Sequence, residues 1–314
     1  MRGVEPVPSD MSSQASERSR VTLSSLAKMA RAGQPFACLT CYDATTARHL
    51  ARAGLHVLLV GDTAAEMVLG FGRTIDMDLD VLIALTAGVK RGAPDLVVMG
   101  DMPFMSYQAG EDEAIKNAGR FLTEGHADIV KLEADASFGP LVAKMTRAGI
   151  PVCGHIGARP QRVAMTGSYG SAGRTRGEAD AIVADAVALV EAGCVQLLIE
   201  AVPEAVTEAV LEAISIPLIG IGAGPACHGQ VLVWQDLVGL SDRPPTFAAP
   251  AADLARAYQE AGRAWVVRVA NRAVGPSPYT AKPEPGSGIA GAVGGGRSAG
   301  GQERPVASRS EPRV

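Results

Sequence analysis

Carboxylate and imidazole side chains stand at the ends of short apolar runs along this chain of 314 residues. Asp62, Asp101 and Glu133 each end such a run, and His155 and Glu200 end two later runs. Carboxylates bind divalent cations, and carboxylates and imidazoles can move protons in catalysis. The sequence therefore predicts an active site, provided that the fold brings the ends of these runs together.

Eight such apolar runs occur along the chain, separated by helical stretches. Short apolar runs of this kind are typical of buried parallel strands. Eight of them predict an α/β fold of the (β/α)8 barrel type, in which the carboxyl ends of the strands form one catalytic face. The expected strands are residues 38–43, 57–62, 96–101, 129–133, 151–155, 195–200, 216–224 and 231–236.

Helices are predicted between the strands and after the last one, at residues 45–52, 142–147, 180–191, 203–214 and 251–273. Glycines that can end a helix follow three of them, at Gly54, Gly149 and Gly193. In the third helix, Val183, Val187 and Val190 recur at helical spacing and are expected to pack on the barrel.

One barrel domain is expected at residues 21–273, between two tails without a core-forming pattern. Residues 1–20 are rich in Ser, Pro, Glu and Arg, and residues 274–314 in Gly, Pro, Ser and Arg. Neither tail can bury enough apolar surface to offset the entropy lost on ordering, so both are expected to be disordered. The hydrophobic share of 47% is sufficient for one large core.

The overall charge excludes several classes of partner. A net charge of −4 and an isoelectric point near 5.8 argue against nucleic acid or an acidic membrane as the main partner. No apolar run approaches the roughly 20 residues of a membrane span, and the first residues lack the hydrophobic region of a signal peptide. A cytoplasmic location is expected.

Two short motifs resemble cofactor sites only weakly. Cys38 and Cys41 form a C-x-x-C string, but residues three apart on a strand point to opposite faces, so a structural role is favoured over a redox pair or a zinc site. Residues 220–224 (GIGAG) lack the acidic ribose partner of a dinucleotide loop. Close approach of this backbone to a ligand or a neighbouring helix is the preferred interpretation.

The acidic groups favour a hard cation. Asp62 and Asp101 end neighbouring predicted strands, and one or two carboxylates with waters and substrate oxygens are typical of Mg²⁺, whereas zinc favours His or Cys. Lys131 and Glu133 face the same side of their strand, so an internal salt bridge is the alternative. We favour the metal, because so many acids repel one another in a dry pocket without a cation. His155 is interpreted as a substrate donor, with a satisfied interior histidine as its alternative.

Two connections that follow strands are longer than the others. They are residues 63–80 and residues 156–177, and the second is rich in Gly, Ser and Arg. Long loops on a catalytic face are often lids that exclude water, although a surface excursion fits this composition equally well.

Seven motifs together resemble the ketopantoate hydroxymethyltransferase family. They are TCYD at 40–43, VGDT at 60–63, GDMPF at 100–104, VKLE at 130–133, CGHIG at 153–157, IEAVP at 199–203 and IGIGAGPACHGQVLVWQD at 219–236. The resemblance implies a barrel of the phosphoenolpyruvate mutase and isocitrate lyase type and a homo-oligomer, a decamer. It also implies transfer of a hydroxymethyl group from the co-substrate 5,10-methylenetetrahydrofolate to 3-methyl-2-oxobutanoate, giving 2-dehydropantoate in pantothenate biosynthesis.

The same resemblance implies roles for individual residues. Glu200 would be the catalytic base that removes the C3 proton of the 2-oxo acid. One Mg²⁺ per subunit would be bound by Asp62, Asp101 and Glu133. The 2-oxo acid would be bound by Asp62, Thr63, Asp101, Lys131 and His155.

The chain also departs from the family pattern, mainly in the two long loops. Thr63 replaces Ser, Glu66 adds a carboxylate, residues 72–78 lack the usual motif, and Gly170 stands where Lys or Arg is common. Three alternatives therefore stay open: a paralogue that uses a modified 2-oxo acid in specialised metabolism, a C–C or P–C lyase or mutase on the same barrel, and a non-catalytic oligomerising paralogue. A lyase or mutase is disfavoured, because no K-K-C-G-H-like string is present.

Overall fold

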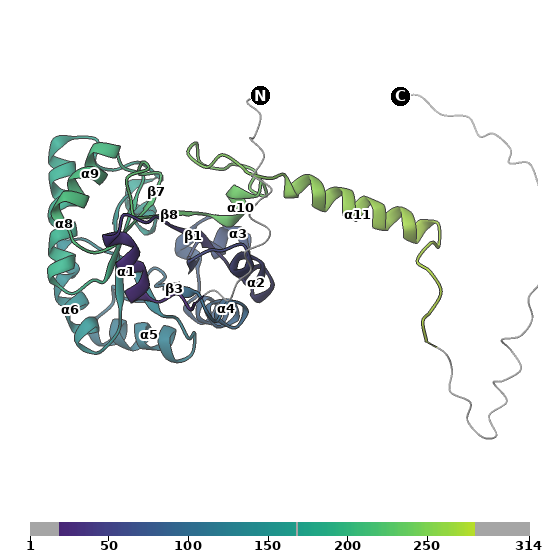
Figure 1. The fold of residues 1–314 in the computed structure, drawn as a ribbon, viewed down its shortest axis with the longest axis horizontal. Coiled ribbons are helices and arrows are strands. Elements are labelled where there is room, and N and C mark those ends of the chain that lie inside the picture. The colour runs from purple at the N-terminus through teal and green to yellow at the C-terminus, as the bar shows by residue number, and fades with distance from the viewer. Residues whose placement is uncertain (1–18, 168, 280–314) are drawn as a thin grey trace, which may run out of the picture. The chain divides into compact units, whose positions relative to one another are not determined.

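The computed structural model describes residues 19–167 and 169–279, and its centre is a closed barrel of eight parallel strands. The strands follow one another around the barrel in chain order, and β1 pairs with β8 to close it. Helices surround the strands (Figure 1). The predicted (β/α)8 barrel is confirmed.

All eight predicted strands are present, with different boundaries in most cases. In the predicted first, second and seventh strands, the last residues lie beyond the observed strand, and in the predicted eighth strand residues 234–236 belong to helix α10 (Trp234–Leu237). The strands are β1 (Phe36–Thr40), β2 (Val57–Val60), β3 (Val97–Asp101), β4 (Ile129–Glu133), β5 (Val152–Gly157), β6 (Gln196–Glu200), β7 (Leu218–Ile221) and β8 (Gly229–Leu232).

The five predicted helices correspond to α2 (Ala44–Arg52), α6 (Gly139–Arg147), α8 (Arg176–Glu191), α9 (Glu204–Ala213) and α11 (Leu254–Ala270). The glycines predicted to end three of them adopt positive φ angles of 94°, 87° and 106° at Gly54, Gly149 and Gly193. The structure adds α1 (Leu23–Arg31), α3 (Ala64–Met67), α4 (Leu79–Gly92), α5 (Glu111–Thr123), α7 (Val163–Thr166) and α10 (Trp234–Leu237). Within the described ranges, no helix combines the length and the apolar character that a membrane crossing requires.

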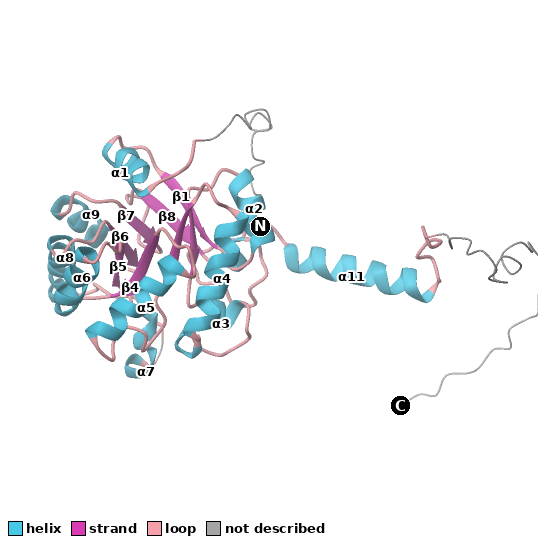
Figure 2. Cartoon of the chain, turned by 90° about the horizontal axis from the view of Figure 1, so that it is seen from below, coloured by secondary structure: helices cyan, strands magenta, loops and turns pink. Residues whose placement is uncertain are grey.

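Apolar side chains form two cores, one inside the barrel and one between the strands and the helices. The inner core contains Cys38, Leu59, Met99 and Leu198 from the strands, and Leu26 of α1 packs with them. Helix α1 lies beside one end of β1 and β8 (Figure 2), so it covers the amino end of the barrel. The opposite, carboxyl end is left for the site.

Two of the three valines predicted to pack on the barrel, Val183 and Val190, contact the core, but an adjacent face of α8 is buried more completely. Ile182, Ala186 and Leu189 are buried, whereas Val183 and Val190 are only partly buried. Both sets have the same i, i+4, i+7 spacing, so spacing alone does not choose between two adjacent helix faces. Both faces contact the core, and the face with Ile182 and Leu189 is the more deeply buried of the two.

The chain divides into two compact units, Met1–Gln259 and Glu260–Val314. The first unit holds the barrel. The described part of the second holds the carboxyl-terminal portion of α11, where the guanidinium of Arg268 lies 5.6 Å from the centre of the Trp265 ring. Most of the two predicted tails, residues 1–20 and 274–314, lies outside the described residues.

The two weak cofactor motifs have structural roles. All five cysteines are buried and free, and Cys38 faces the inner core while Cys41 faces the outer core. In the glycine string, Gly224 has a φ of +81°, and a Cβ there would lie 3.0 Å from Cγ of Glu204 in α9. The preferred interpretation of close approach to a neighbouring helix is confirmed.

Two glycines of α4 provide a test of the packing between α2 and α4. A Cβ on Gly92 would lie 2.3 Å from the carbonyl oxygen of Ala44, so Gly92→Ala is expected to lower the free energy of unfolding by about 1–3 kcal/mol. Around Gly88 the nearest atom is 4.0 Å away, so Gly88→Ala should raise it by up to about 1 kcal/mol. Urea unfolding of the two variants measures both effects. Equal stabilities would contradict this packing.

Candidate active site

A cavity of about 80 Å³ lies at the carboxyl end of the barrel. It is lined by all seven residues that the sequence predicts for the site, namely Asp62, Thr63, Asp101, Lys131, Glu133, His155 and Glu200. Asp43, which also ends a predicted strand, does not line it. Its exposed carboxylate accepts hydrogen bonds from the backbone amides of Thr45 and Thr46 and caps α2.

Strand register places the charged side chains beside one another. Asp101 of β3 is aligned with Lys131 of β4, and Glu133 of β4 is aligned with His155 of β5. Lys131 Nζ donates to Asp101 Oδ1 over 2.5 Å, and both side chains are almost fully buried. The barrel geometry therefore forces opposite charges together in a dry environment.

Three buried carboxylates form the acidic part of the site. Burial, together with repulsion from Asp101, raises the pKa of Asp62 to about 7. Burial also raises the pKa of Glu133 to about 8. Burial acts to lower the pKa of Lys131, but attraction from Asp101, Asp62 and Glu133 raises it above its ordinary value. The surroundings therefore oppose simultaneous ionisation of all the carboxylates, whereas they favour the charged form of Lys131.

The salt bridge predicted as an alternative is present, but it compensates only one of the three carboxylates. Asp62 and Glu133 receive neutral donors: the side-chain amide of Gln161 donates to Asp62, and the backbone amide of Gln161 donates to Glu133. Neutral donors stabilise a carboxylate without cancelling its charge. A divalent cation would offset the two charges that remain.

The donor set has the chemistry for Mg²⁺. It consists of carboxylate oxygens, which Mg²⁺ prefers, and this ion keeps several waters or substrate oxygens in its coordination sphere. Among the described residues, no group of three or more His, Cys, Asp or Glu side chains is placed so that it could hold a metal ion by itself. The chain thus offers part of a coordination sphere and leaves positions for a ligand.

His155 of β5 and Glu200 of β6 line the same cavity, and His155 Nδ1 lies 3.9 Å from Glu133 Oε1. The imidazole is buried, and burial together with the charge of Lys131 lowers the pKa of His155, so the ring is neutral at pH 7. Its Nε2 atom lies 3.2 Å from Glu200 Oε2, yet neither ring nitrogen meets hydrogen-bond geometry with a described group. The described interior groups therefore leave both ring nitrogens of His155 without a hydrogen bond, and the ring can donate to a ligand.

A glycine makes room for Glu200. Gly157 of β5 is aligned with Glu200 of β6 and has a φ of +85°. A Cβ on Gly157 would lie 2.6 Å from the carbonyl oxygen of Glu200. The strand end can therefore turn away beside Glu200, whose side chain remains 23% exposed at the mouth of the cavity.

Several site residues are absent from the sequence predictions. Tyr42 shares a 2.6 Å hydrogen bond with the hydroxyl of Thr63, and its place in the TCYD motif beside a strand end is a usable signal. Gln161 and Tyr107 lie in loops and make hydrogen bonds to each other and to the acidic cluster. Nothing in the local sequence pattern marks these two residues as part of the site.

The two long loops contact each other beside the mouth. The hydroxyl of Tyr169 donates to Glu66 Oε1 over 3.3 Å and accepts from the backbone amide of Thr74 over 3.4 Å. Glu66, the extra carboxylate, therefore contacts the second loop and does not line the cavity. Burial raises the pKa of Glu66.

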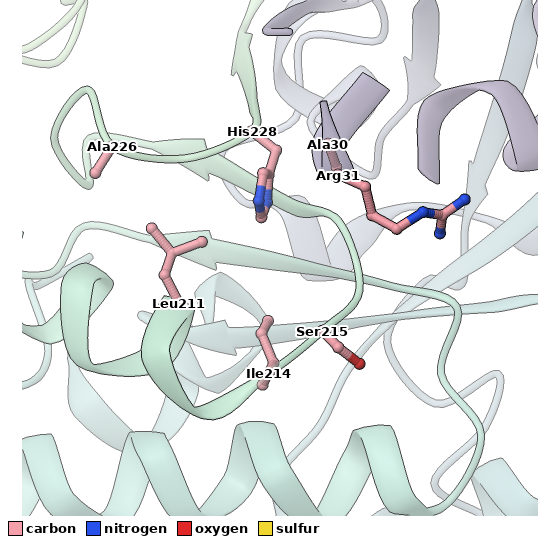
Figure 3. A pocket seen from close by; sticks show the side chains of 7 residues that line it. All are labelled: Ala30, Arg31, Leu211, Ile214, Ser215, Ala226 and His228. Atoms are coloured by element: carbon pink, nitrogen blue, oxygen red, sulfur yellow. The ribbon is translucent and has the colours of Figure 1, made fainter. Parts of the chain in front are cut away.

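A second hollow, of about 220 Å³, lies at the amino end of the barrel, where the last residues of α1 and α9 meet the start of β8. His228 and Leu211 line it, and the side chain of Arg31 extends away from both of them (Figure 3). The imidazole Nδ1 of His228 accepts a hydrogen bond from the backbone amide of Leu218, the first residue of β7, so His228 has a structural role at the start of that strand. No convergent set of charged groups lines this hollow, in contrast to the cavity at the carboxyl end.

Known proteins match the chain over most of its length. The model of the ketopantoate hydroxymethyltransferase family matches residues 20–276. The 3-methyl-2-oxobutanoate hydroxymethyltransferase of Moorella thermoacetica is 44% identical over 77% of this chain and 90% of its own length. The enzyme of the same name from Carboxydothermus hydrogenoformans is 45% identical over 80% of this chain and 91% of its own.

Solved structures share the fold at low sequence identity. One is 2,3-dimethylmalate lyase, a member of the PEP mutase/isocitrate lyase superfamily, with a TM-score of 0.53 at 16% identity over 83% of this chain and 89% of that chain. Another is phosphoenolpyruvate phosphomutase from Streptomyces platensis, with a TM-score of 0.53 at 13% identity over 78% of this chain and 88% of that chain. These likenesses agree with the predicted (β/α)8 barrel fold.

The raised pKa of Asp62 predicts how the stability of the metal-free protein depends on pH. The unfolded chain loses this proton near pH 4 and the folded chain near pH 7, so between these values the folded state binds more protons and its stability falls as pH rises. Asp62→Asn cannot acquire the charge. In EDTA, the melting temperature of the variant minus that of the wild type should therefore increase from pH 5 to pH 8. The expected increase in this difference is on the order of 5 °C. A difference that does not change with pH would contradict the repulsion within the cluster.

Proposed function

Because the chain belongs to the ketopantoate hydroxymethyltransferase family, and is therefore a transferase enzyme, we propose that it transfers a hydroxymethyl group from 5,10-methylenetetrahydrofolate to 3-methyl-2-oxobutanoate, with one Mg²⁺ per subunit. The product is 2-dehydropantoate. The observation that carries this proposal is that the acidic cluster and the Glu200–His155 pair line the same cavity. A site for a chelated 2-oxo acid and a site for a base thus lie side by side.

The strand ends of β2, β3 and β4 provide the binding half of the site. Asp62, Asp101 and Glu133 would hold Mg²⁺, which when bound acts as a Lewis acid that withdraws charge from the 2-oxo group and acidifies the C3 hydrogen. Lys131 adds a fixed positive charge that attracts the substrate carboxylate. The hydroxyl of Thr63, held by Tyr42, can hydrogen-bond to the same anion.

The strand ends of β5 and β6 provide the proton-transfer half. Glu200 lines the same cavity as the acidic cluster, and it accepts the C3 proton of the bound substrate. Neutral His155, whose Nε2 lies 3.2 Å from Glu200 Oε2 without hydrogen-bond geometry, can donate to a substrate oxygen in the buried cavity. Hydrolysis of both C–N bonds of methylenetetrahydrofolate by one water supplies the one-carbon unit as formaldehyde and leaves tetrahydrofolate. The C3 carbon nucleophile then adds to the formaldehyde carbon, and the resulting alkoxide takes up a proton to give the hydroxymethyl group.

The departures from the family pattern leave the cavity lining almost unchanged. Glu66 and Gly170 do not line it, and Thr63 retains the hydroxyl of the Ser that it replaces. This supports the ordinary 2-oxo acid over a modified one as the acceptor. Retention of all seven site residues in one cavity supports a catalytic chain over a non-catalytic paralogue.

Cellular setting and assembly belong to the proposal as well. We expect a cytoplasmic homo-oligomer, a decamer by resemblance to the family, whose partners are the small-molecule substrates. Neither nucleic acid nor a membrane is an expected partner at a net charge of −4.

Glu200→Gln tests the assignment of the base. With Mg²⁺ and no folate, the wild type should exchange the C3 hydrogen of 3-methyl-2-oxobutanoate with deuterated water, because proton removal precedes transfer. The amide keeps the volume but cannot take the proton, so exchange followed by NMR should fall by about 10²–10⁴-fold.

Glu66→Gln is the matched control, since Glu66 is a half-buried carboxylate outside the cavity. It should exchange at the wild-type rate. Exchange that survives in Glu200→Gln would remove Glu200 from the mechanism. Absence of exchange in the wild type would argue against this acceptor.

A further inference from the structure

We propose that Gln161 is a positioning residue of the metal site, which fixes the orientation of two carboxylates, Asp62 and Glu133, so that they can bind the cation. This inference rests on the proposed function, because it takes the acidic cluster to be a Mg²⁺ site. It concerns a residue in the loop after β5, outside the three predicted metal ligands.

Gln161 is buried in spite of its place in a loop. It lies in the short 3-10 helix η4 (Pro160–Arg162), and only 3% of its surface is exposed. Its backbone amide donates to both carboxylate oxygens of Glu133, over 3.0 Å and 3.2 Å. The loop after β5 is thereby attached to the end of β4 at the acidic cluster.

The side chain of Gln161 reaches two further strands. Nε2 donates to Asp62 Oδ2 and to the carbonyl oxygen of Met102, each over 3.0 Å. Asp62 follows β2, and Met102 follows β3 directly after Asp101. One residue of the β5 loop therefore links the ends of three strands that carry the carboxylates.

The orientation of the amide is determined by its neighbours. Its oxygen accepts from the hydroxyl of Tyr107 over 2.8 Å and from Nε2 of Gln108 over 3.3 Å. A flipped amide would place its oxygen against the carboxylate of Asp62 and the carbonyl of Met102, which are both acceptors. The donor group of Gln161 is thus directed at Asp62.

The neutral charge of these donors matters for a cation site. Lys131 cancels the charge of Asp101, but Gln161 holds Asp62 and Glu133 without cancelling theirs. The charges of these two oriented carboxylates are therefore left for Mg²⁺ to balance, and binding of the cation favours their ionised form. Groups that orient metal ligands in this way typically contribute about 10–100-fold to metal affinity.

Gln161→Met separates this role from packing, because methionine has a similar length and no donor. Mg²⁺ titrated into the full-length variant should bind with about 10–100-fold lower affinity by isothermal titration calorimetry. In the exchange assay, the Mg²⁺ concentration for half-maximal rate should rise by a similar factor, while the rate at saturating Mg²⁺ stays within a few-fold of the wild type. A purely structural defect would lower the active fraction at every Mg²⁺ concentration.

Gln196→Met is the matched control. Gln196 is also buried, with 1% of its surface exposed, and neither atom of its amide has a hydrogen-bond partner in the described structure. It should bind Mg²⁺ as the wild type does. A second variant, Gln161→Asn, keeps the polarity but is one carbon too short to reach Asp62, so it should weaken binding in the same direction if Gln161→Met does not fold.

The outcomes separate the two proposals. Wild-type affinity in both folded Gln161 variants would overturn the positioning role and leave the proposed function intact. Absence of Mg²⁺ binding by the wild type would overturn the metal site, and the role of Gln161 with it. Equal weakening in Gln161→Met and Gln196→Met would also overturn the positioning role, because any buried amide would then have the same effect.

Discussion

Negative charge buried at the carboxyl end of the barrel is the constraint on which the rest of the site depends. Three carboxylates and one ammonium group share a region with almost no access to water. Burying ions without compensation costs several kcal/mol each, roughly, so such a cluster persists only with partners for each charge. The chain supplies Lys131 for one carboxylate and neutral amide donors for the others, and a cation would complete the set.

This constraint divides the cavity into two halves. Strands β2 to β4 carry the acids and the lysine, whereas β5 and β6 carry a neutral imidazole and the more exposed carboxylate of Glu200. The division follows from strand order, because neighbouring strands place their carboxyl ends beside one another. In the function that we propose, a 2-oxo acid chelated on the first half would present its C3 atom to the second half.

Much of this arrangement could be predicted from the sequence. The apolar runs ending in polar residues predict both the barrel and the residues that meet at its mouth, since the end of a parallel strand has a fixed place in that fold. Position alone did not separate a site residue from a helix cap: Asp43 ends a run like Asp62 does, yet it caps α2. Likewise, helical spacing could not distinguish the Val183 face of α8 from the buried Ile182 face beside it.

The loops were the least predictable part. Gln161 contacts Asp62, which lies far from it in the sequence. Such a long-range contact depends on how the loop folds back over the barrel. The same holds for Glu66, which pairs with Tyr169 of the other long loop. Predicted lids and surface excursions have similar compositions, so only the structure shows which groups these loops bring to the mouth.

Product identity tests the central claim most directly. The purified full-length chain would be incubated with 3-methyl-2-oxobutanoate, Mg²⁺ and methylenetetrahydrofolate that is isotopically labelled at the methylene carbon, and the products would be read by mass spectrometry. We predict that the acid gains one labelled CH₂O unit, and that omission of the folate or chelation of Mg²⁺ abolishes the gain. An unchanged acid, a cleaved acid, or full turnover without the folate would contradict it.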